Sequence, residues 1–113
     1  MSVIDRNTFD ALRETTGDDF VRELVATFLE EAPSMLADLT DALAKNEPDR
    51  FRRAAHSLKS NGNTFGALAL AGKARELEMR GLAADAAADE AAIAEIDAAY
   101  ADAAAELKSL SHG

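Results

Sequence analysis

The fold is decided by one stretch of sequence, residues 51–66, which reads FRRAAHSLKSNGNTFG. At about 100° of rotation per helical residue, its apolar and small side chains fall within one narrow stripe. This stripe predicts the core-facing side of a helix and consists of Phe51, Ala55, Leu58, Gly62 and Phe65. A second set, which we expect to face solvent, consists of Arg52, His56, Lys59 and Asn63. The stretch therefore predicts an amphipathic helix that presents a histidine to solvent.

Two helices are predicted upstream of this stretch. A short helix from Asp5 to Thr16 ends at Gly17. Either Asp18 or Asp19 is expected to cap the long helix that follows. Pro33 is expected to kink or split that helix, because proline removes a backbone hydrogen bond and clashes with the preceding turn. The wide apolar stripe of the long helix consists of Phe20, Val21, Leu24, Val25, Phe28, Leu29, Ala32, Met35, Leu36, Leu39 and Leu43.

The ends of the histidine-bearing helix carry their own signals. Asn46 suits a left-handed exit from the long helix, and Pro48 suits the first turn of the next one. Gly66 is the natural terminator. Gly62 lies inside the helical pattern, where glycine costs roughly 1 kcal/mol relative to alanine. We therefore expect Gly62 to permit the close approach of another backbone.

Two further helices complete the chain. The segment from Ala67 to Arg80 ends at Gly81, and the segment from Ala83 to Leu110 is acidic and rich in alanine. Signals for β structure are missing. The sequence therefore predicts an all-α fold, an antiparallel four-helix bundle with a short N-terminal helix packed over one end. The length of 113 residues predicts a single domain over residues 1–113.

Composition excludes several classes of function. The chain has no cysteine, which excludes disulfides and thiolate metal sites and leaves the redox compartment open. Its two histidines, His56 and His112, have no metal-binding spacing, so we expect no metal bound by this chain. A net charge of −9 argues against nucleic acid and anionic membranes as partners. Without a membrane-spanning apolar run or a secretory leader, a cytoplasmic protein is expected.

One part of the chain departs from this acidic average. Residues 50–75 contain no Asp or Glu, yet they carry six basic residues, namely Arg50, Arg52, Arg53, Lys59, Lys73 and Arg75. Such a stretch favours a surface that binds phosphate or an acidic partner, although a simple solvated face is the alternative. A neutral histidine with one free ring nitrogen is a nucleophile, and nearby positive charge favours a phosphoryl electrophile. Lys59 lies one turn from His56, and the small Ser60 keeps the approach open.

Several runs of residues resemble a known family, and together they cover nearly the whole chain. The run Ala55-His56-Ser57-Leu58-Lys59-Ser60, then Phe65-Gly66-Ala67 and later Leu77-Glu78, resembles the histidine-containing phosphotransfer (HPt) domain. The usual pattern there is His-x-Leu-Lys-Gly, then Gly-Ala, then Leu-Glu. This chain departs from it at Ser60, where glycine is commonest. The run Phe-Leu-Glu-Glu-Ala-Pro at positions 28–33 is also similar to that family.

The resemblance implies a phosphoryl shuttle. His56 would be the phosphorylated residue, Lys59 its electrostatic neighbour and Ser60 the small residue beside it, whereas Glu78 has a variable role in the family. Phosphoryl groups would pass between His56 and the aspartates of receiver domains in a multistep two-component phosphorelay. The Mg²⁺ of that exchange would be bound by the partner receiver.

Further expectations concern the mode of action. His56 is followed by Ser57 rather than by an acidic residue, and no glycine-rich nucleotide loop is visible. We therefore expect a carrier that neither autophosphorylates nor binds ATP. The start methionine favours a free-standing protein, and we expect a monomer. Partner docking could extend to Phe9, Leu12 and Val21, which are equally well explained as core residues.

Two other classes of function stay open at this point. In the first, the chain is a non-catalytic helical adaptor whose basic stretch docks an acidic protein, and His56 is incidental. In the second, more distant one, it is a metalloenzyme, which the shortage of ligands disfavours.

Overall fold

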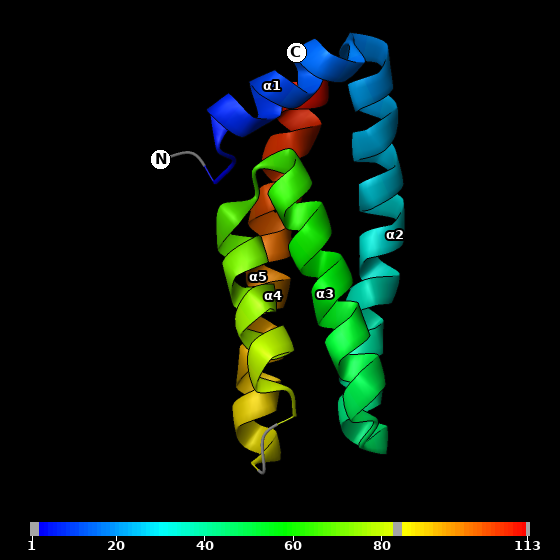
Figure 1. Ribbon diagram of the computed structural model, residues 1–113, viewed down its shortest axis with the longest axis vertical. Coiled ribbons are helices and arrows are strands. Elements are labelled where there is room, and N and C mark those ends of the chain that lie inside the picture. The colour runs from blue at the N-terminus through cyan, green and yellow to red at the C-terminus, as the bar shows by residue number, and fades with distance from the viewer. Residues whose placement is uncertain (1–2, 83–84, 113) are drawn as a thin grey trace.

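The described part of the chain, residues 3–82 and 85–112 of a computed structural model, forms helices joined by short turns and contains no strand. Four of these helices run alternately up and down the molecule, as Figure 1 shows. They are α2 (Asp18–Lys45), α3 (Pro48–Phe65), α4 (Leu68–Arg80) and α5 (Ala86–His112). The short helix α1 (Arg6–Thr16) lies across one end of them (Figure 1). The predicted all-α architecture is therefore confirmed, including the position of its N-terminal helix.

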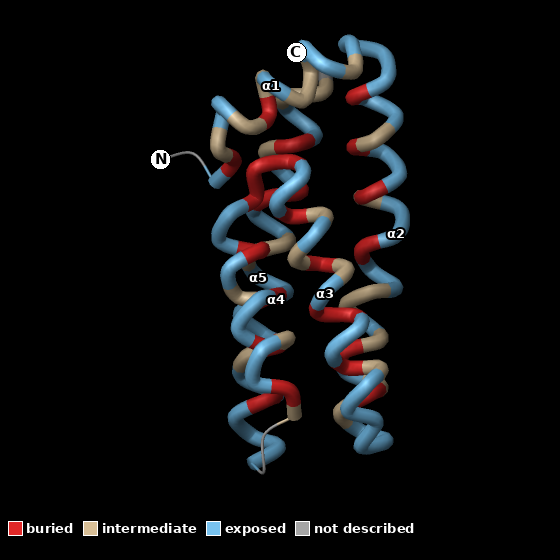
Figure 2. The backbone as a smooth tube through the Cα atoms, in the orientation of Figure 1, coloured by how far each residue is buried: buried red, intermediate tan, exposed pale blue. Residues whose placement is uncertain are grey.

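The core lies along the facing sides of the four bundle helices, where the buried positions gather in Figure 2. The predicted phase of α3 is confirmed, because Phe51, Ala55 and Leu58 are fully buried and Phe65 is 2% exposed. One residue of the stripe predicted for α2 was placed wrongly. The Phe20 side chain is 50% exposed, whereas the adjacent Val21 is 2% exposed, so the buried face of α2 begins at Val21.

Helix α2 begins and continues differently from the prediction. Gly17 occupies its N-cap position, so Asp18 and Asp19 lie inside the first turn, where their charges favour the positive end of the helix dipole. The predicted split at Pro33 is wrong, because α2 continues through this residue. Ala32 and Leu39 on either side of it are fully buried. Core packing therefore holds both halves in one helix, while Pro33 itself is exposed.

The ends of α3 agree with the sequence. Asn46 adopts the left-handed conformation with φ of 53°, Pro48 lies in the first turn of α3, and Gly66 ends it with φ of 82°. Gly62 permits close contact with α4, because an added Cβ would lie 3.1 Å from both Cβ and N of Ala71. This packing places α4 next to α3, on the side of α3 that also carries His56.

The remaining bounds differ slightly from those predicted. Helix α4 begins at Leu68 rather than Ala67, and α5 extends past Leu110 to His112. Ala83, the predicted first residue of the last helix, lies outside the described residues. None of the helices described here is long and apolar enough to cross a membrane.

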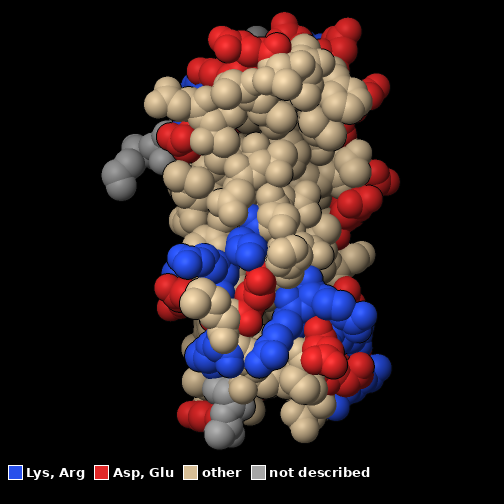
Figure 3. Space-filling view, viewed as in Figure 1, with Lys and Arg blue, Asp and Glu red and all other residues tan. Residues whose placement is uncertain are grey.

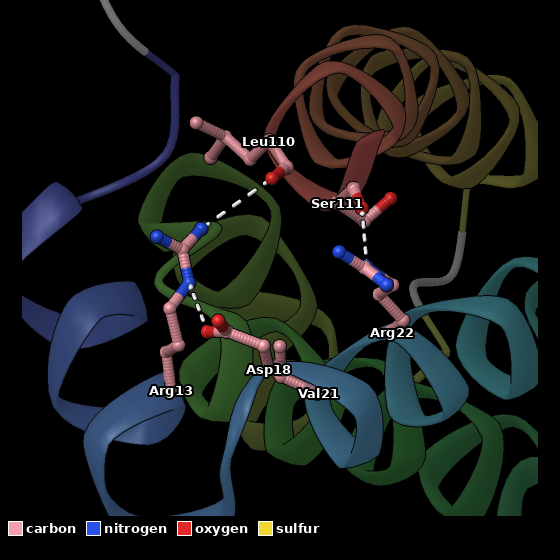
Figure 4. Close-up of a pocket in the computed structure, with 6 residues that line it drawn as sticks. All are labelled: Arg13, Asp18, Val21, Arg22, Leu110 and Ser111. Carbon is pink, nitrogen blue, oxygen red and sulfur yellow. Dashed lines mark hydrogen bonds and ion pairs between the residues drawn. The ribbon is translucent and has the colours of Figure 1, made fainter. Parts of the chain in front are cut away.

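Two arginines hold the end of α5 against α1 and α2 (Figure 4). Arg13 donates to the carbonyl oxygen of Leu110 at 3.4 Å, and Arg22 donates to that of Ser111 at 3.1 Å. The last carbonyls of a helix have no partner within it, so these bonds satisfy the end of α5. The small hollow between these side chains is therefore a junction of helix ends, and both of its guanidinium groups are already engaged.

Candidate functional site

His56 lies near the middle of α3, on the side away from the core. Its side chain is 60% exposed, whereas its neighbour Ala55 is fully buried. The alternation follows from the helical phase, which turns position 56 outward while position 55 packs inward. The predicted exposure of the histidine is thus confirmed.

A carboxylate from α4 contacts the imidazole ring. The two carboxylate oxygens of Glu78 lie 3.1 and 3.2 Å from Nδ1 of His56. The same carboxylate accepts hydrogen bonds from Nζ of Lys59, with distances of 2.9 and 3.1 Å. Glu78 therefore bridges the two residues of α3 that the sequence singled out, and it joins α3 to α4 beside the histidine.

This contact determines which ring nitrogen is free. An ionised carboxylate can only accept hydrogen bonds, so Nδ1 of His56 carries the hydrogen that it donates to Glu78. In the neutral ring, Nε2 then has no hydrogen and keeps its lone pair. The contact with Glu78 also orients the ring, and the side chain that carries Nε2 is 60% exposed.

The electrostatics of the bridge favour an ionised Glu78. The Lys59 ammonium, and less strongly the His56 ring, hold the pKa of Glu78 below its usual value, while partial burial acts in the opposite direction. A charged carboxylate beside Nδ1 stabilises positive charge on the imidazole ring. Such charge develops when Nε2 forms a bond to an electrophile.

A shallow hollow beside His56 is lined by residues of both helices, namely Arg52, Arg53, His56, Ser57 and Glu78. Figure 3 shows Lys and Arg side chains gathered over the lower half of this face, where α3 begins and α4 ends, and an uncharged area above them. Of the six residues of the basic stretch predicted from the sequence, Arg52 and Arg53 line the hollow beside the histidine.

The structure brings only some of the predicted site residues together. Lys59 is only 24% exposed, so the expectation of a solvent-facing lysine is wrong: its ammonium turns inward to Glu78. Ser60 is exposed on the turn after His56 but does not line the hollow, whereas Ser57 does. No acidic residue follows His56 in the sequence, and the carboxylate that contacts its imidazole comes from another helix. The signal for Glu78 in the sequence is its place in the Leu77-Glu78 pair of the family resemblance, which leaves its role open.

The three residues suggested for docking do not share one surface. Phe9 is fully buried and Val21 is 2% exposed, because both pack into the core, and Leu12 packs partly against it. Among the residues that the structure describes, the exposed large apolar side chains are Val3, Phe20, Leu68 and Met79. Within the described residues, no three His, Asp or Glu side chains converge as metal ligands.

A helical bundle that presents one oriented, exposed histidine among basic side chains has the form of a phosphotransfer module. The sequence model of the Hpt domain matches residues 23–107, and the chain belongs to this family. Hpt proteins are histidine phosphotransfer proteins of two-component systems, and they interact with receiver domains of response regulators or kinases. No sequence among curated proteins matches the chain significantly.

The structure also resembles a solved one. It is similar to the crystal structure of histidine-containing phosphotransfer protein B (HptB) from Pseudomonas aeruginosa PAO1, with a TM-score of 0.82. The two sequences are 26% identical, and the match covers 96% of this chain and 94% of that chain. The short helix α1 lies outside the residues matched by the family model. The structural match to HptB extends beyond those residues, because it covers 96% of this chain.

Proposed function

We propose that His56 accepts a phosphoryl group from the aspartate of one receiver domain and passes it to the aspartate of another in a multistep phosphorelay. The observation that carries this proposal is the contact of Glu78 with Nδ1, because in a neutral imidazole it leaves Nε2 as the nitrogen with the lone pair, on a side chain that is 60% exposed. The chain would act as a monomer, with residues 1–113 as one domain.

The proposed phosphoryl transfer requires no proton transfer. The Nε2 lone pair attacks phosphorus, the bond from phosphorus to the aspartyl oxygen breaks, and the aspartate leaves with that electron pair. The ring then carries a positive charge, which the hydrogen bond from Nδ1 to Glu78 stabilises. In the onward step a second aspartate attacks phosphorus, and Nε2 recovers its lone pair.

The residues near His56 have separate roles in this proposal. Glu78 orients the ring, and Lys59 holds Glu78 in place and ionised. Ser60, a small residue on the next turn, leaves the approach to Nε2 open. Any Mg²⁺ that takes part would be held by the carboxylates of the receiver.

The test uses the two histidines of the chain as a matched pair. The protein is incubated with a phosphorylated receiver and Mg²⁺, and phosphate that is acid-labile and base-stable is measured on it. The His56→Ala variant should acquire none, and His112→Ala should behave like wild type. Transfer that survives in His56→Ala would overturn the proposal, and receiver binding without any transfer would favour the helical adaptor.

A further inference from the structure

The lysine expected to meet the phosphoryl group is already engaged in this structure. Nζ of Lys59 lies 2.9 and 3.1 Å from the two oxygens of Glu78, and the side chain is only 24% exposed. Its positive charge is therefore largely balanced within the protein. A phosphoryl group on Nε2 would carry about two negative charges, which require positive partners of their own.

Two arginines beside His56 are not engaged in this way. Arg52 and Arg53 line the hollow that contains the histidine, and neither forms an ion pair with any described residue. Most other basic side chains do have a carboxylate partner, for instance Arg50 with Asp38 at 2.7 Å. In a chain with 21 acidic and 12 basic residues, free arginines at this place indicate a ligand that carries negative charge.

The geometry of α3 brings these arginines and the histidine together. Side chains on a helix lean toward its N-terminus, so the His56 ring lies over the preceding turn, which carries Arg52 and Arg53. The guanidinium of Arg52 also reaches α4, because a Cβ added to Gly81 would lie 3.0 Å from its Nε and Nη2 atoms. Arg52 therefore spans the two helices on the side of the hollow where Glu78 lies.

We propose that Arg52 and Arg53 bind the phosphoryl group carried by Nε2 of His56, by donating N–H groups to its terminal oxygens. The planar guanidinium fork suits the tetrahedral oxygens of a phosphoryl group. This inference rests on the proposed function and names the binding residues of that same site. Lys59 then acts through Glu78, and the two arginines supply the positive charge.

The first test removes the partner protein. Phosphoramidate, a small phosphoryl donor, is incubated with the purified chain, and the rate of phosphohistidine formation is followed by ³¹P NMR. Arg52→Gln/Arg53→Gln should lower this rate about tenfold or more, as loss of charge-assisted hydrogen bonds predicts, and Arg52→Lys/Arg53→Lys, which keeps the charge without the fork, should recover only part of it. The matched control is Arg75→Gln/Lys108→Gln, which removes two exposed, unpaired charges outside the hollow and should change the rate less than about twofold.

A spectroscopic readout tests the contact itself. The Nε–H resonances of Arg52 and Arg53 should shift when wild-type protein is phosphorylated, while that of Arg75 should stay in place. Equal rates in Arg52→Gln/Arg53→Gln and in the control Arg75→Gln/Lys108→Gln would overturn the inference. Unmoved Arg52 and Arg53 resonances would overturn it as well, as would a wild-type chain that phosphoramidate does not modify. A defect seen only with a phosphorylated receiver would also overturn it, because the arginines would then dock an acidic partner surface. These results differ from failure of the relay itself, in which no receiver transfers phosphate to wild-type protein.

Discussion

At the scale of single residues, the bridge formed by Glu78 couples protonation to folding. The pKa of this carboxyl is lowered in the folded chain, chiefly by Lys59. A carboxyl whose folded pKa lies below its unfolded value stabilises the fold above the unfolded pKa. That contribution is lost as the pH falls through the folded pKa. Glu78 should therefore stabilise the bundle at neutral pH and cease to do so in acid.

The first prediction follows from this sign. The Glu78→Gln variant should unfold at a lower temperature than wild type at pH 7, and the difference should shrink once the pH falls below the ordinary carboxyl value of 4.5. Thermal unfolding followed by circular dichroism between pH 7 and pH 3 measures the difference. Glu76→Gln is the control, since this exposed neighbour on α4 makes no ion pair within the described residues. A difference that persists unchanged in acid would contradict the assigned role of the carboxylate.

A second residue-scale prediction concerns Lys59. The Lys59→Ala variant loses the largest influence that lowers the pKa of Glu78 and keeps the partial burial that raises it. The pKa of Glu78 should therefore increase, as ¹³C NMR titration of its side chain would show. Phosphotransfer to His56 should slow, because the carboxylate that orients the ring is held less firmly.

The control for this variant is Lys73→Ala, which removes a lysine paired with Glu95 instead. It should leave the titration of Glu78 unchanged. If Lys59→Ala also leaves that titration in place, the hydrogen bonds between Lys59 and Glu78 do not govern the site.

At the scale of helices, two glycines that both lie inside helices, Gly62 buried and Gly72 exposed, should respond in opposite ways to alanine. Gly62→Ala places a Cβ 3.1 Å from Ala71 and 3.2 Å from the carbonyl oxygen of Ala67, so α4 must shift away from α3. We expect a loss of about 1–3 kcal/mol of stability, as for other overpacked sites. Gly72 lies within α4 with nothing within 4 Å of an added Cβ. Gly72→Ala should therefore gain roughly 0.5–1 kcal/mol from helix propensity.

Urea unfolding of both variants tests this contrast, since a pure propensity effect would stabilise both. A stabilised Gly62→Ala variant would mean that the distance between α3 and α4 is larger than in this structure. The measurement bears on function as well, because the spacing of these two helices sets the distance from Glu78 to His56.

Sequence periodicity predicted the helices well because each helix has its own apolar stripe, as the burial of Phe51, Leu58 and Phe65 shows. The backbone chemistry of Pro33 predicted a kink or a split, and the split is absent because α2 continues through this residue. Packing of Ala32 and Leu39 into the core outweighs the lost hydrogen bond there. Only part of the candidate site could be predicted from the sequence. The positions of His56 and Lys59 follow from one helix, whereas the role of Glu78 depends on how α4 packs against α3, which no local pattern specifies.

At the scale of the whole molecule, α1 closes one end of the bundle. Backbone N–H of Asp5 donates to the carbonyl oxygen of Gly66 at 2.8 Å. The carboxylate of Glu106 on α5 accepts from Ile4 N–H at 2.9 Å. The Ile4 and Phe9 side chains are almost completely buried. These contacts join α1 to the turn after α3 and to the far end of the chain, so α1 stabilises the fold by long-range contacts.

Removal of residues 1–16 should therefore separate stability from chemistry. Burial of Ile4 and Phe9 is worth about 1.5–3 kcal/mol each, offset by the entropy of ordering the helix, so the truncated chain should melt at a lower temperature and stay helical. His56 lies nine residues before Phe65, roughly 14 Å along α3 from the end that α1 covers. Its modification by phosphoramidate should therefore proceed at nearly the wild-type rate. Phe9→Ala in the intact chain is the control for burial alone and should lower the melting temperature in the same direction. A truncated chain that stays folded but loses phosphoramidate reactivity would show that α1 acts on the histidine as well as on the fold.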